Sequence, residues 1–488
     1  MENALKINEN DNVAVALTDL NKGEIIFDII LSDDIKKGHK FALENITENE
    51  KIIKYNNSIG IATKNIKKGE WVHSHNLKTN IKENENYEFS GGFPYLKEES
   101  QYMFMGYERK NGKVGIRNKI AIIPTVGCVN KTCEIIKKRV LEFHEVDEEI
   151  CVFSHPYGCS QLGDDREYTA KCISALLKNP NIGGALLVSL GCENNNLEYM
   201  RSFLNDCDKE RVLTLVTQES DNEIADGVAL VKKLAEKLSQ DVRTIQPFEK
   251  LTIGFKCGGS DGVSGITANP LCGYITDYFT SIGGKVILTE VPEMFGAEKT
   301  LFKRCVNEDV FKKAVSMVEG FKKYFVSHNQ VVYENPSPGN KDGGITTLEE
   351  KSLGCITKGG NSAVTDVLSI YDECKTDGLS LLWGPGNDIV SATNLACAGA
   401  SLIVFTTGRG TPLGAPVPTL KVSTNSDLYE KKKEWIDFDA GELLNGKSLE
   451  DLSKDLLKKI ISVANGDPTK NEINGYEEIA IFKDGVIL

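Results

Sequence analysis

The stretch Leu251-Thr-Ile-Gly-Phe-Lys-Cys-Gly-Gly-Ser-Asp-Gly-Val-Ser-Gly265 joins an apolar run to a glycine-rich polar turn. The run from Leu251 to Phe255 has the length and composition of a buried β-strand. Open α/β sheets bind their ligands in turns of this kind, where parallel strands end. The stretch therefore predicts an α/β fold with its chemistry at the turn 256–265, and so favours an enzyme.

Strand and helix patterns alternate on both sides of this turn. Upstream, we expect strands at 119–125, 150–154, 184–190 and 211–216, and helices at 131–143, 168–177 and 222–239. Downstream, we expect strands at 250–256, 284–290, 379–383, 401–406 and 419–422, and helices at 268–282, 308–323, 362–370 and 389–398. Such alternation predicts βαβ units and largely parallel sheets.

The N-terminal part of the chain has a different pattern. Residues 1–78 hold short β-type runs broken by Gly, Asn and Asp, which predict a small all-β module. Residues 79–105 are polar and without periodicity, as in a linker. The expected architecture is multidomain, with a first α/β domain over 106–248 and a second over 249–488.

Composition limits the classes of partner. The 488 residues have a net charge of −13, which does not favour nucleic acid. The first residues lack the apolar core of a signal peptide, and the apolar runs are far shorter than the ~18 residues of a membrane span. Thirteen cysteines without an export signal are typical of reduced thiols, so we expect a cytoplasmic protein. Assembly into a homo-oligomer is compatible with this composition.

His73-Ser74-His75 is a candidate metal site at the end of the β module. If the segment is a strand, both imidazoles point to one face and can bind one transition-metal ion. The alternative is a pair of histidines on a solvent face or bonded to the backbone.

The turn 256–265 is a candidate anion site. Its glycines allow backbone N–H groups to converge on a carboxylate, while Lys256 adds charge and Asp261 could act as a base. The alternative is a tight turn that needs glycine only for its backbone angles.

Cys128, Cys159, Cys192 and Cys257 each follow an expected strand, so their thiols could meet at one sheet edge. Three of them could hold an iron–sulfur cluster. The alternative is small thiols packed in tight turns, because free cysteine is often buried.

Further charged residues complete the candidates. Arg117 and Arg409 offer planar forks for a carboxylate, or could instead bond loop carbonyls. Glu193, Glu290 and Glu293 follow expected strands and could serve as bases or ligands, or as capping carboxylates.

Seven motifs resemble those of the altronate/galactarate dehydratase family, and the overall chain length is more similar to that of its altronate-type members than to that of the somewhat longer galactarate enzymes. They are Gly69-Glu-Trp-Val-His-Ser-His-Asn76, Gly112-Lys-Val-Gly-Ile-Arg-Asn118, His155-Pro-Tyr-Gly-Cys-Ser-Gln161, Leu190-Gly-Cys-Glu193, Lys256-Cys-Gly-Gly-Ser-Asp-Gly262, Pro338-Gly-Asn-Lys341 and Thr406-Thr-Gly-Arg-Gly410. Residues 1–78 resemble the β-clip (SAF) module of that family. A related sulfolactate lyase keeps this module on a separate subunit, which implies that catalysis needs it.

The resemblance implies a hydro-lyase that converts D-altronate to 2-dehydro-3-deoxy-D-gluconate and water. It implies a divalent ion, Fe²⁺ or Mn²⁺, without a compulsory iron–sulfur cluster, and favours His73 and His75 as its ligands. Removal of the C2 proton and loss of the 3-hydroxyl are expected to use Lys256, Asp261, Glu193 and Glu290. The residues expected to bind substrate are Arg117, Asn118, Cys159, Ser160, Cys192, Cys257, Gly258, Gly259, Ser260, Asn269, Lys341 and Arg409.

Four alternatives stay open at this point. The substrate could be galactarate or another hexonate or aldarate, or the chain could be a sulfolactate-type lyase. It could be an oxygen-sensitive dehydratase with an iron–sulfur cluster on the turn cysteines. It could also be a sugar-acid-binding protein without catalysis.

Overall fold

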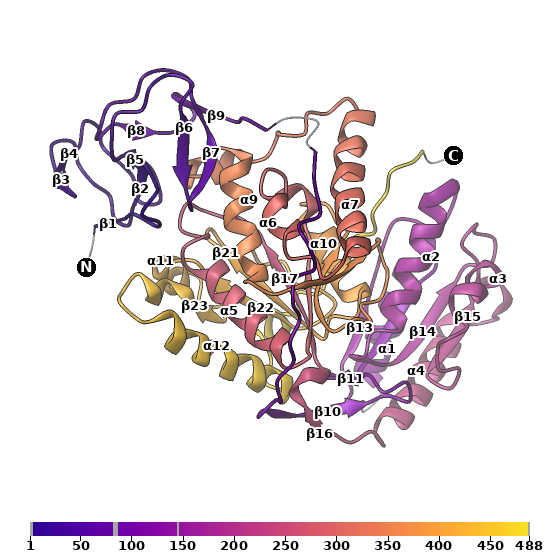
Figure 1. Cartoon of the computed structure of the whole chain (residues 1–488). Helices are drawn as coiled ribbons and strands as arrows, with labels where there is room; N and C mark the ends of the chain where they lie inside the picture. Colours follow the sequence, from indigo (N-terminus) through magenta and orange to yellow (C-terminus); the bar gives the residue numbers. More distant parts are fainter. Residues whose placement is uncertain (1–2, 82–85, 144–145, 487–488) are drawn as a thin grey trace.

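The computed structural model describes residues 3–81, 86–143 and 146–486 and divides into a small β module and an α/β body (Figure 1). The module has an antiparallel sheet of order β1-β2-β5-β8 and a second of order β6-β7-β9. These strands are β1 (Ala4–Leu5), β2 (Val13–Ala16), β5 (Lys40–Ala42), β8 (Trp71–Val72), β6 (Lys51–Lys54), β7 (Asn57–Ala62) and β9 (Leu77–Lys78), beside the hairpin β3 (Ile25–Ile26) and β4 (Ile29–Ile30). The all-β module predicted from the sequence is confirmed.

A small antiparallel sheet joins the expected linker to the body. In it, β10 (Met103–Glu108) pairs with β11 (Val114–Gly115) and with β16 (Thr244–Pro247). The last strand lies at the end of the first α/β domain, so this sheet closes that domain before the second begins.

The first α/β domain has a parallel sheet of order β13-β12-β14-β15. Its strands are β12 (Lys119–Pro124), β13 (Ile150–Val152), β14 (Ile182–Ser189) and β15 (Val212–Val216). Helices α1 (Asn130–Phe143) and α4 (Glu223–Leu238) pack together on one face. Helix α2 (Gly163–Leu177) packs against α10 (Asp388–Cys397) of the second α/β domain, so the two domains share an apolar core.

The second α/β domain has a seven-stranded parallel sheet of order β19-β20-β18-β17-β21-β22-β23. Its strands are β17 (Thr252–Cys257), β18 (Lys285–Leu288), β19 (Val364–Leu368), β20 (Gly378–Leu382), β21 (Leu402–Thr407), β22 (Thr419–Ser423) and β23 (Phe438–Asp439). Its longer helices are α5 (Ala268–Ser281), α7 (Glu308–Ser327), α9 (Leu348–Ile356), α10 and α12 (Leu449–Ala464). The prediction of largely parallel sheets is confirmed for both domains.

Two expectations from the sequence differ from the secondary structure of this domain. The helix expected at 362–370 is wrong, because Val364–Leu368 forms the edge strand β19. Val364, Thr365 and Val367 are β-branched and favour a strand over a helix. Helix α9 was not expected, although all nine of its residues are buried. No helix in the described ranges is long and apolar enough to cross a membrane.

Candidate active site

The carboxyl ends of β17 and β21 form the point where the order of the second sheet reverses. From β17 the chain builds β18 to one side, and later adds β21 to the other. Doubly wound sheets bind ligands in the crevice at such a point. Here the Gly258 N–H donates to the Thr406 carbonyl at 3.0 Å, and the Gly408 N–H to the Gly259 carbonyl at 3.2 Å. The two loops therefore form one wall of the crevice.

A cavity of about 700 Å³ opens at this crevice. Its lining residues come from the second α/β domain, and they include Cys257, Gly258, Gly259, Pro292, Glu293, Asn335, Ser337, Asn340, Lys351, Gly386, Asn387, Asp388 and Thr411. The segment 335–344 contributes a wall through Asn335, Ser337 and the short helix α8 (Pro338–Asp342), which Ser337 caps. The 256–265 turn predicted from the sequence thus meets a cavity at its first glycines.

Two thiols and a carboxylate converge beside this cavity, and two of the three residues, Cys257 and Glu293, line it. The sulfur atoms of Cys257 and Cys355 are 3.4 Å apart, and Glu293 Oε2 lies 3.1 Å from the first and 3.0 Å from the second. Among the residues that the structure describes, this is the one group whose ligand atoms all lie within 4.8 Å of one another. Thiolates and carboxylates ligate divalent transition metals, so the group could hold such an ion.

Two lysines set the charge of this group. Lys351 Nζ lies 2.8 Å from Glu293 Oε1, and Lys358 Nζ lies 2.9 Å from Cys257 Sγ. Burial disfavours the Glu293 carboxylate, but Lys351 and Lys358 outweigh it and lower the pKa of Glu293 to about 2. The hydrogen bond between the two thiols and the burial of Cys355 raise the pKa of Cys355. Glu293 is therefore an anion at neutral pH, which a metal ligand requires.

An ion cluster centred on the buried Lys256 adjoins the wall to which Cys257 contributes. Lys256 is fully buried and donates to Glu290 Oε1 at 2.7 Å and to Asp388 Oδ1 at 2.8 Å. Burial disfavours the ammonium, but Glu290 and Asp388 more than offset it and raise the pKa of Lys256. Lys256 thus stays protonated and orients Asp388, whose side chain is 37% exposed at the cavity.

Glu290 has a strained backbone, with φ of 72° and ψ of 61°. This left-handed conformation is uncommon for a residue other than glycine, and strain of this kind gathers at functional sites. Its Oε2 accepts from the Cys257 N–H at 3.0 Å. Glu290 therefore fixes both Lys256 and the start of the 257 turn.

Helix α9 links the cavity to the β module. Lys351 and Cys355 of this helix face the cavity group, whereas Glu350 accepts from Lys40 at 2.8 Å and from Lys54 at 2.9 Å. All three side chains of that ion triad are 1% exposed. The module is thus anchored to the same helix that supplies two residues of the site.

The Glu350 carboxylate gives one testable dependence on pH. Burial disfavours it, but Lys40 and Lys54 lower its pKa from 4.5 to about 2. Its contribution to stability is therefore present above pH 4.5 and is lost as pH falls through about 2. Between neutral pH and pH of about 2, the free energy of unfolding should fall by roughly 3 kcal/mol less in Glu350→Gln than in the unchanged protein. Urea unfolding across this pH range measures the difference. Glu349→Gln, on the same helix, is the matched control and should leave the dependence in place, because burial raises the pKa of Glu349.

The structure does not bring Arg117 and Asn118 to the cavity. The Arg117 guanidinium forms a two-point ion pair with Glu472 and donates to the carbonyls of Ile116, Val463 and Asp467. Asn118 accepts from Arg109. These contacts favour the structural alternative, in which Arg117 holds the C-terminal segment on the first α/β domain.

Four further candidates lie in the first α/β domain, away from the residues that line the cavity. Cys159, Ser160 and Cys192 are on its loops. Glu193 is buried and accepts from Ser189, Thr125 and two backbone N–H groups, and these bonds lower its pKa despite its burial. Its carboxylate is thus committed to the 189–193 turn.

The remaining turn candidates, Ser260 and Asp261, do not line the cavity. Asp261 accepts from Ser264, Thr424 and Asn425, and its burial raises its pKa. The Ser260 carbonyl accepts from Asn340. Three other candidates also lie outside the lining set: Asn269 bonds Gly354 and Thr406, Arg409 is exposed and donates to Gly339, and Lys341 belongs to α8.

His73 and His75 follow strand β8, which ends at Val72, so the expected strand geometry does not hold. Their rings pack beside the same Trp71 ring, with centroid separations of 5.2 and 4.9 Å. His73 Nδ1 lies 2.8 Å from Thr346 Oγ1 of the body. His73 therefore sits at the contact between module and body, whereas His75 is exposed, and the role of both imidazoles as metal ligands stays a prediction.

The sequence reasoning missed Lys351, Lys358, Cys355 and Asp388 as site residues. The first three lie on or just after α9, where Glu349-Glu350-Lys351 has the composition of a solvated surface. The sequence held one signal for Cys355: this residue is next to a glycine, Gly354, just as Cys257 is next to Gly258.

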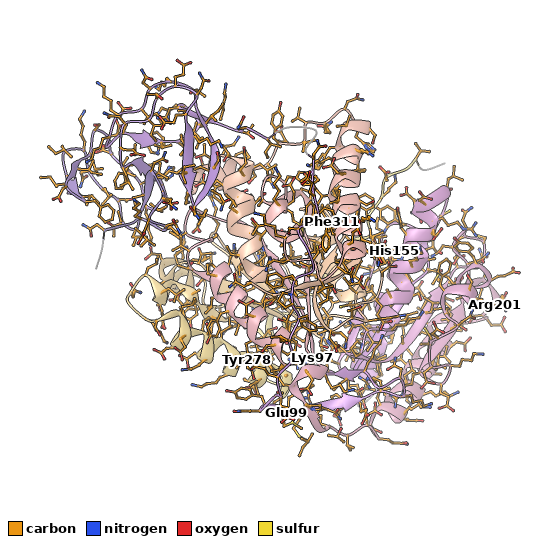
Figure 2. The ribbon with its side chains drawn as sticks, in the orientation of Figure 1. Lys97, Glu99, His155, Arg201, Tyr278 and Phe311 are labelled. Atoms are coloured by element: carbon orange, nitrogen blue, oxygen red, sulfur yellow. The ribbon has the colours of Figure 1, made fainter. Side chains whose placement is uncertain are left out.

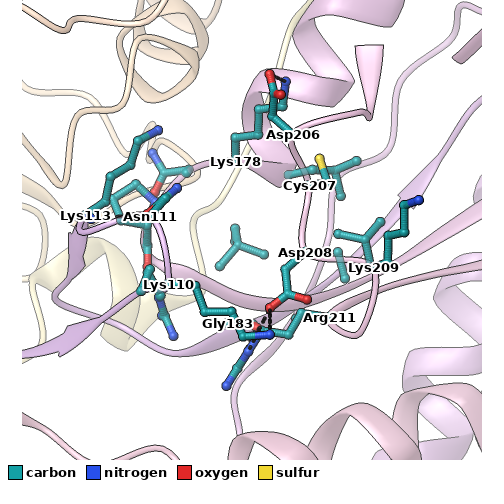
Figure 3. Close-up of a pocket in the computed structure, with 18 of the residues that line it drawn as sticks. Lys110, Asn111, Lys113, Lys178, Gly183, Asp206, Cys207, Asp208, Lys209 and Arg211 are labelled. Carbon is teal, nitrogen blue, oxygen red and sulfur yellow. Dashed lines mark hydrogen bonds and ion pairs between the residues drawn. The ribbon is translucent and has the colours of Figure 1, made fainter. Parts of the chain in front are cut away.

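A second cavity, of about 550 Å³, lies at the opposite edge of the first sheet, near the start of β14 and β15 (Figure 3). Lys110, Lys113, Lys178 and Lys209 stand around it, with Arg211 at its base. Arg211 is committed to a two-point ion pair with Asp241. Parallel sheets bind ligands at the carboxyl ends of their strands, so this cavity is not the candidate site.

Comparison with known proteins identifies one family across most of the chain. Three family descriptions match in succession: the altronate/galactarate dehydratase SAF domain over 2–80, the D-galactarate dehydratase/altronate hydrolase second domain over 106–239, and the D-galactarate/altronate dehydratase C-terminal domain over 248–487. The chain is 48% identical to an altronate dehydratase of Bacillus subtilis (strain 168) over all of both chains. It is 47% identical to an altronate dehydratase of Escherichia coli (strain K12) over 99% of each. It is 32% identical to an L-threo-forming galactarate dehydratase of the same bacterium over 98% of this chain and 96% of that one. The chain belongs to the altronate/galactarate dehydratase family.

Proposed function

We propose that this chain is a metal-dependent hydro-lyase that converts D-altronate to 2-dehydro-3-deoxy-D-gluconate and water. Identity of 47–48% to two relatives named altronate dehydratase, against 32% to one named for galactarate, supports altronate as the substrate. The observation that carries the reaction is the cavity at the β17–β21 crevice, where a metal-ligand group and an accessible carboxylate share one wall.

Asp388 is the group proposed to take the proton from C2. It is the carboxylate that is both partly exposed at the cavity and held by a permanently charged partner, Lys256. A base must lie within hydrogen-bond reach of the proton it removes, so access to the cavity is the first requirement. The proton taken from C2 then returns to the departing 3-hydroxyl, which leaves as water, and the enol product tautomerises to the 2-keto acid.

Lys351 is proposed to bind the substrate carboxylate. Its ammonium lines the cavity, and Glu293 raises its pKa although burial opposes this, so it stays charged. Negative charge grows on the substrate carboxylate as C2 loses its proton. A fixed ammonium beside that carboxylate stabilises the transition state more than the ground state.

Cys257, Glu293 and Cys355 are proposed to hold the divalent ion, Fe²⁺ or Mn²⁺. Their donor set fits a divalent ion, because three ligand atoms already converge. In the structure, the Lys358 ammonium supplies positive charge next to Cys257. When bound, such an ion supplies Lewis-acid stabilisation of a carboxylate and a hydroxyl. We place the ion here rather than at His73 and His75 because the imidazoles lie in a turn outside the cavity lining.

A panel of hexonates and aldarates, assayed for 2-keto acid with Fe²⁺ or Mn²⁺, tests the proposal. We expect turnover of D-altronate, with kcat/KM for galactarate lower by at least about tenfold, because the two acids differ at the end of the chain. Preference for galactarate or a sulfonated acid would overturn the substrate. Tight binding of altronate without 2-keto acid under either metal would instead indicate a sugar-acid-binding protein.

A further inference from the structure

Three cysteines of the first α/β domain are exposed in a protein that otherwise buries its thiols. All thirteen cysteines lie in the described ranges; nine are buried, Cys207 is half-buried, and Cys128, Cys159 and Cys192 are exposed. Free cysteine is among the most buried residue types. Each exposed cysteine directly follows a glycine: Gly127, Gly158 or Gly191.

The three Gly-Cys pairs follow three adjacent parallel strands. Cys128 follows β12, Cys159 follows β13 and Cys192 follows β14, and the sheet order is β13-β12-β14. The chain builds β13 on one side of β12 and then β14 on the other, so the order of this sheet reverses here. The cysteines thus stand at its carboxyl edge, where open α/β sheets bind ligands.

Backbone hydrogen bonds tie the three loops together. The Gly127 N–H donates to the Tyr157 carbonyl at 2.8 Å, and the Asn195 N–H donates to the Gly158 carbonyl at 3.1 Å. Asn194 Oδ1 accepts from the Ser160 N–H at 2.8 Å. The loop of Cys159 is therefore joined on one side to that of Cys128 and on the other to that of Cys192.

His155, which is labelled in Figure 2, anchors the central loop to the sheet through hydrogen bonds of its ring. Its ring is buried, and Nε2 donates to the Pro124 carbonyl at the end of β12 at 2.8 Å. Nδ1 accepts from the Tyr157 N–H at 3.2 Å. The imidazole therefore fixes the loop that leads to Cys159.

Glycine is required at two of the three positions. Gly158 has φ of +105°, and a Cβ there would lie 2.2 Å from the Thr125 carbonyl oxygen. Gly191 has φ of +123°, and a Cβ there would lie 2.8 Å from Gln218 Oε1. The side-chain amide of Gln218 also donates to Cys192 Sγ at 3.5 Å. The glycines permit the close approach of the loops while the thiols stay at the surface.

We propose that Cys128, Cys159 and Cys192 form a three-thiolate site for an iron–sulfur cluster. Thiolates are the usual ligands of such clusters, and each thiol loses its proton on binding iron. The three sulfur atoms do not all lie within 4.8 Å of one another, unlike the Cys257–Glu293–Cys355 group. This three-thiolate site is separate from the proposed divalent ion, and it does not depend on the proposed reaction.

The test uses full-length protein reconstituted without oxygen with a mixture of ferric and ferrous iron and sulfide, so that no further oxidant is needed, and then desalted. We expect visible absorption from sulfur-to-iron charge transfer and acid-labile sulfide in stoichiometric amount. Cys128→Ser, Cys159→Ser and Cys192→Ser should each reduce bound sulfide at least severalfold. Cys207→Ser, a half-buried thiol of the same domain outside these loops, is the matched control and should retain the cluster.

Two results would overturn this site. One is reconstituted protein that holds no sulfide while Cys128, Cys159 and Cys192 remain open to alkylation. The other is iron bound without sulfide and lost in the three variants, which would assign a single ion instead. Turnover of altronate by protein without sulfide would leave the proposed function intact, so the two proposals fail separately.

Discussion

Glu293→Gln is expected to abolish binding of the divalent ion and to lower kcat for D-altronate by at least about a hundredfold. The carboxylate shares one oxygen with both Cys257 and Cys355, at 3.1 and 3.0 Å, so an amide removes the anionic ligand at the centre of the group. A loss of about 3 kcal/mol of transition-state stabilisation corresponds to this factor. Metal content of desalted protein and initial rates of 2-keto acid formation measure the two effects.

Glu298→Gln is the matched control for this change. Glu298 is also a buried glutamate paired with a lysine, Lys322, at 3.1 Å, but it does not line the cavity. We expect this variant to lose stability and to keep its metal content and its rate per folded molecule. If Glu293→Gln retained metal and rate, the Cys–Glu–Cys group would not be the metal site.

Glu350→Ala is expected to lower the free energy of unfolding by about 3–5 kcal/mol, because it leaves Lys40 and Lys54 buried without their shared partner. Turnover should fall with it, since α9 also supplies Lys351 and Cys355. Urea unfolding gives the stability, and limited proteolysis between module and body reports whether the module has come away.

A triple variant separates the charge from the contact. Lys40→Met, Lys54→Met and Glu350→Leu together replace the triad with apolar side chains of similar size, which often restores or raises stability. We expect this variant to regain stability and most of the turnover. Unchanged stability of Glu350→Ala would show that the triad does not anchor the module.

The sequence could place the fold and part of the site because both depend on local patterns. The apolar run 251–255 followed by glycines identified β17 and its turn, and Cys257, Gly258 and Gly259 line the cavity. Lys256 and Glu290 were expected as catalytic residues; in the structure they contact Asp388 and the turn rather than lining the cavity, and a catalytic role for them stays a prediction.

The rest depends on contacts between segments far apart in the chain. Glu349-Glu350-Lys351 has a polar composition, and only the docked module and the cavity explain why this helix is buried. In the sequence Arg117 is a candidate anion site, but in the structure its guanidinium is paired with Glu472, which lies 355 residues later in the chain. The turns of Cys128, Cys159, Cys192 and Cys257 look alike in sequence, but the first three lie in the first α/β domain and the last lies in the second.

The most direct measurement is a crystal structure with Mn²⁺ and D-altronate, with the metal located by anomalous scattering. We expect the anomalous peak between Cys257, Glu293 and Cys355, and the sugar acid in the adjacent cavity with C2 within hydrogen-bond reach of Asp388. A peak at His73 and His75, with altronate bound between module and body, would contradict the account and return the active site to the imidazole pair.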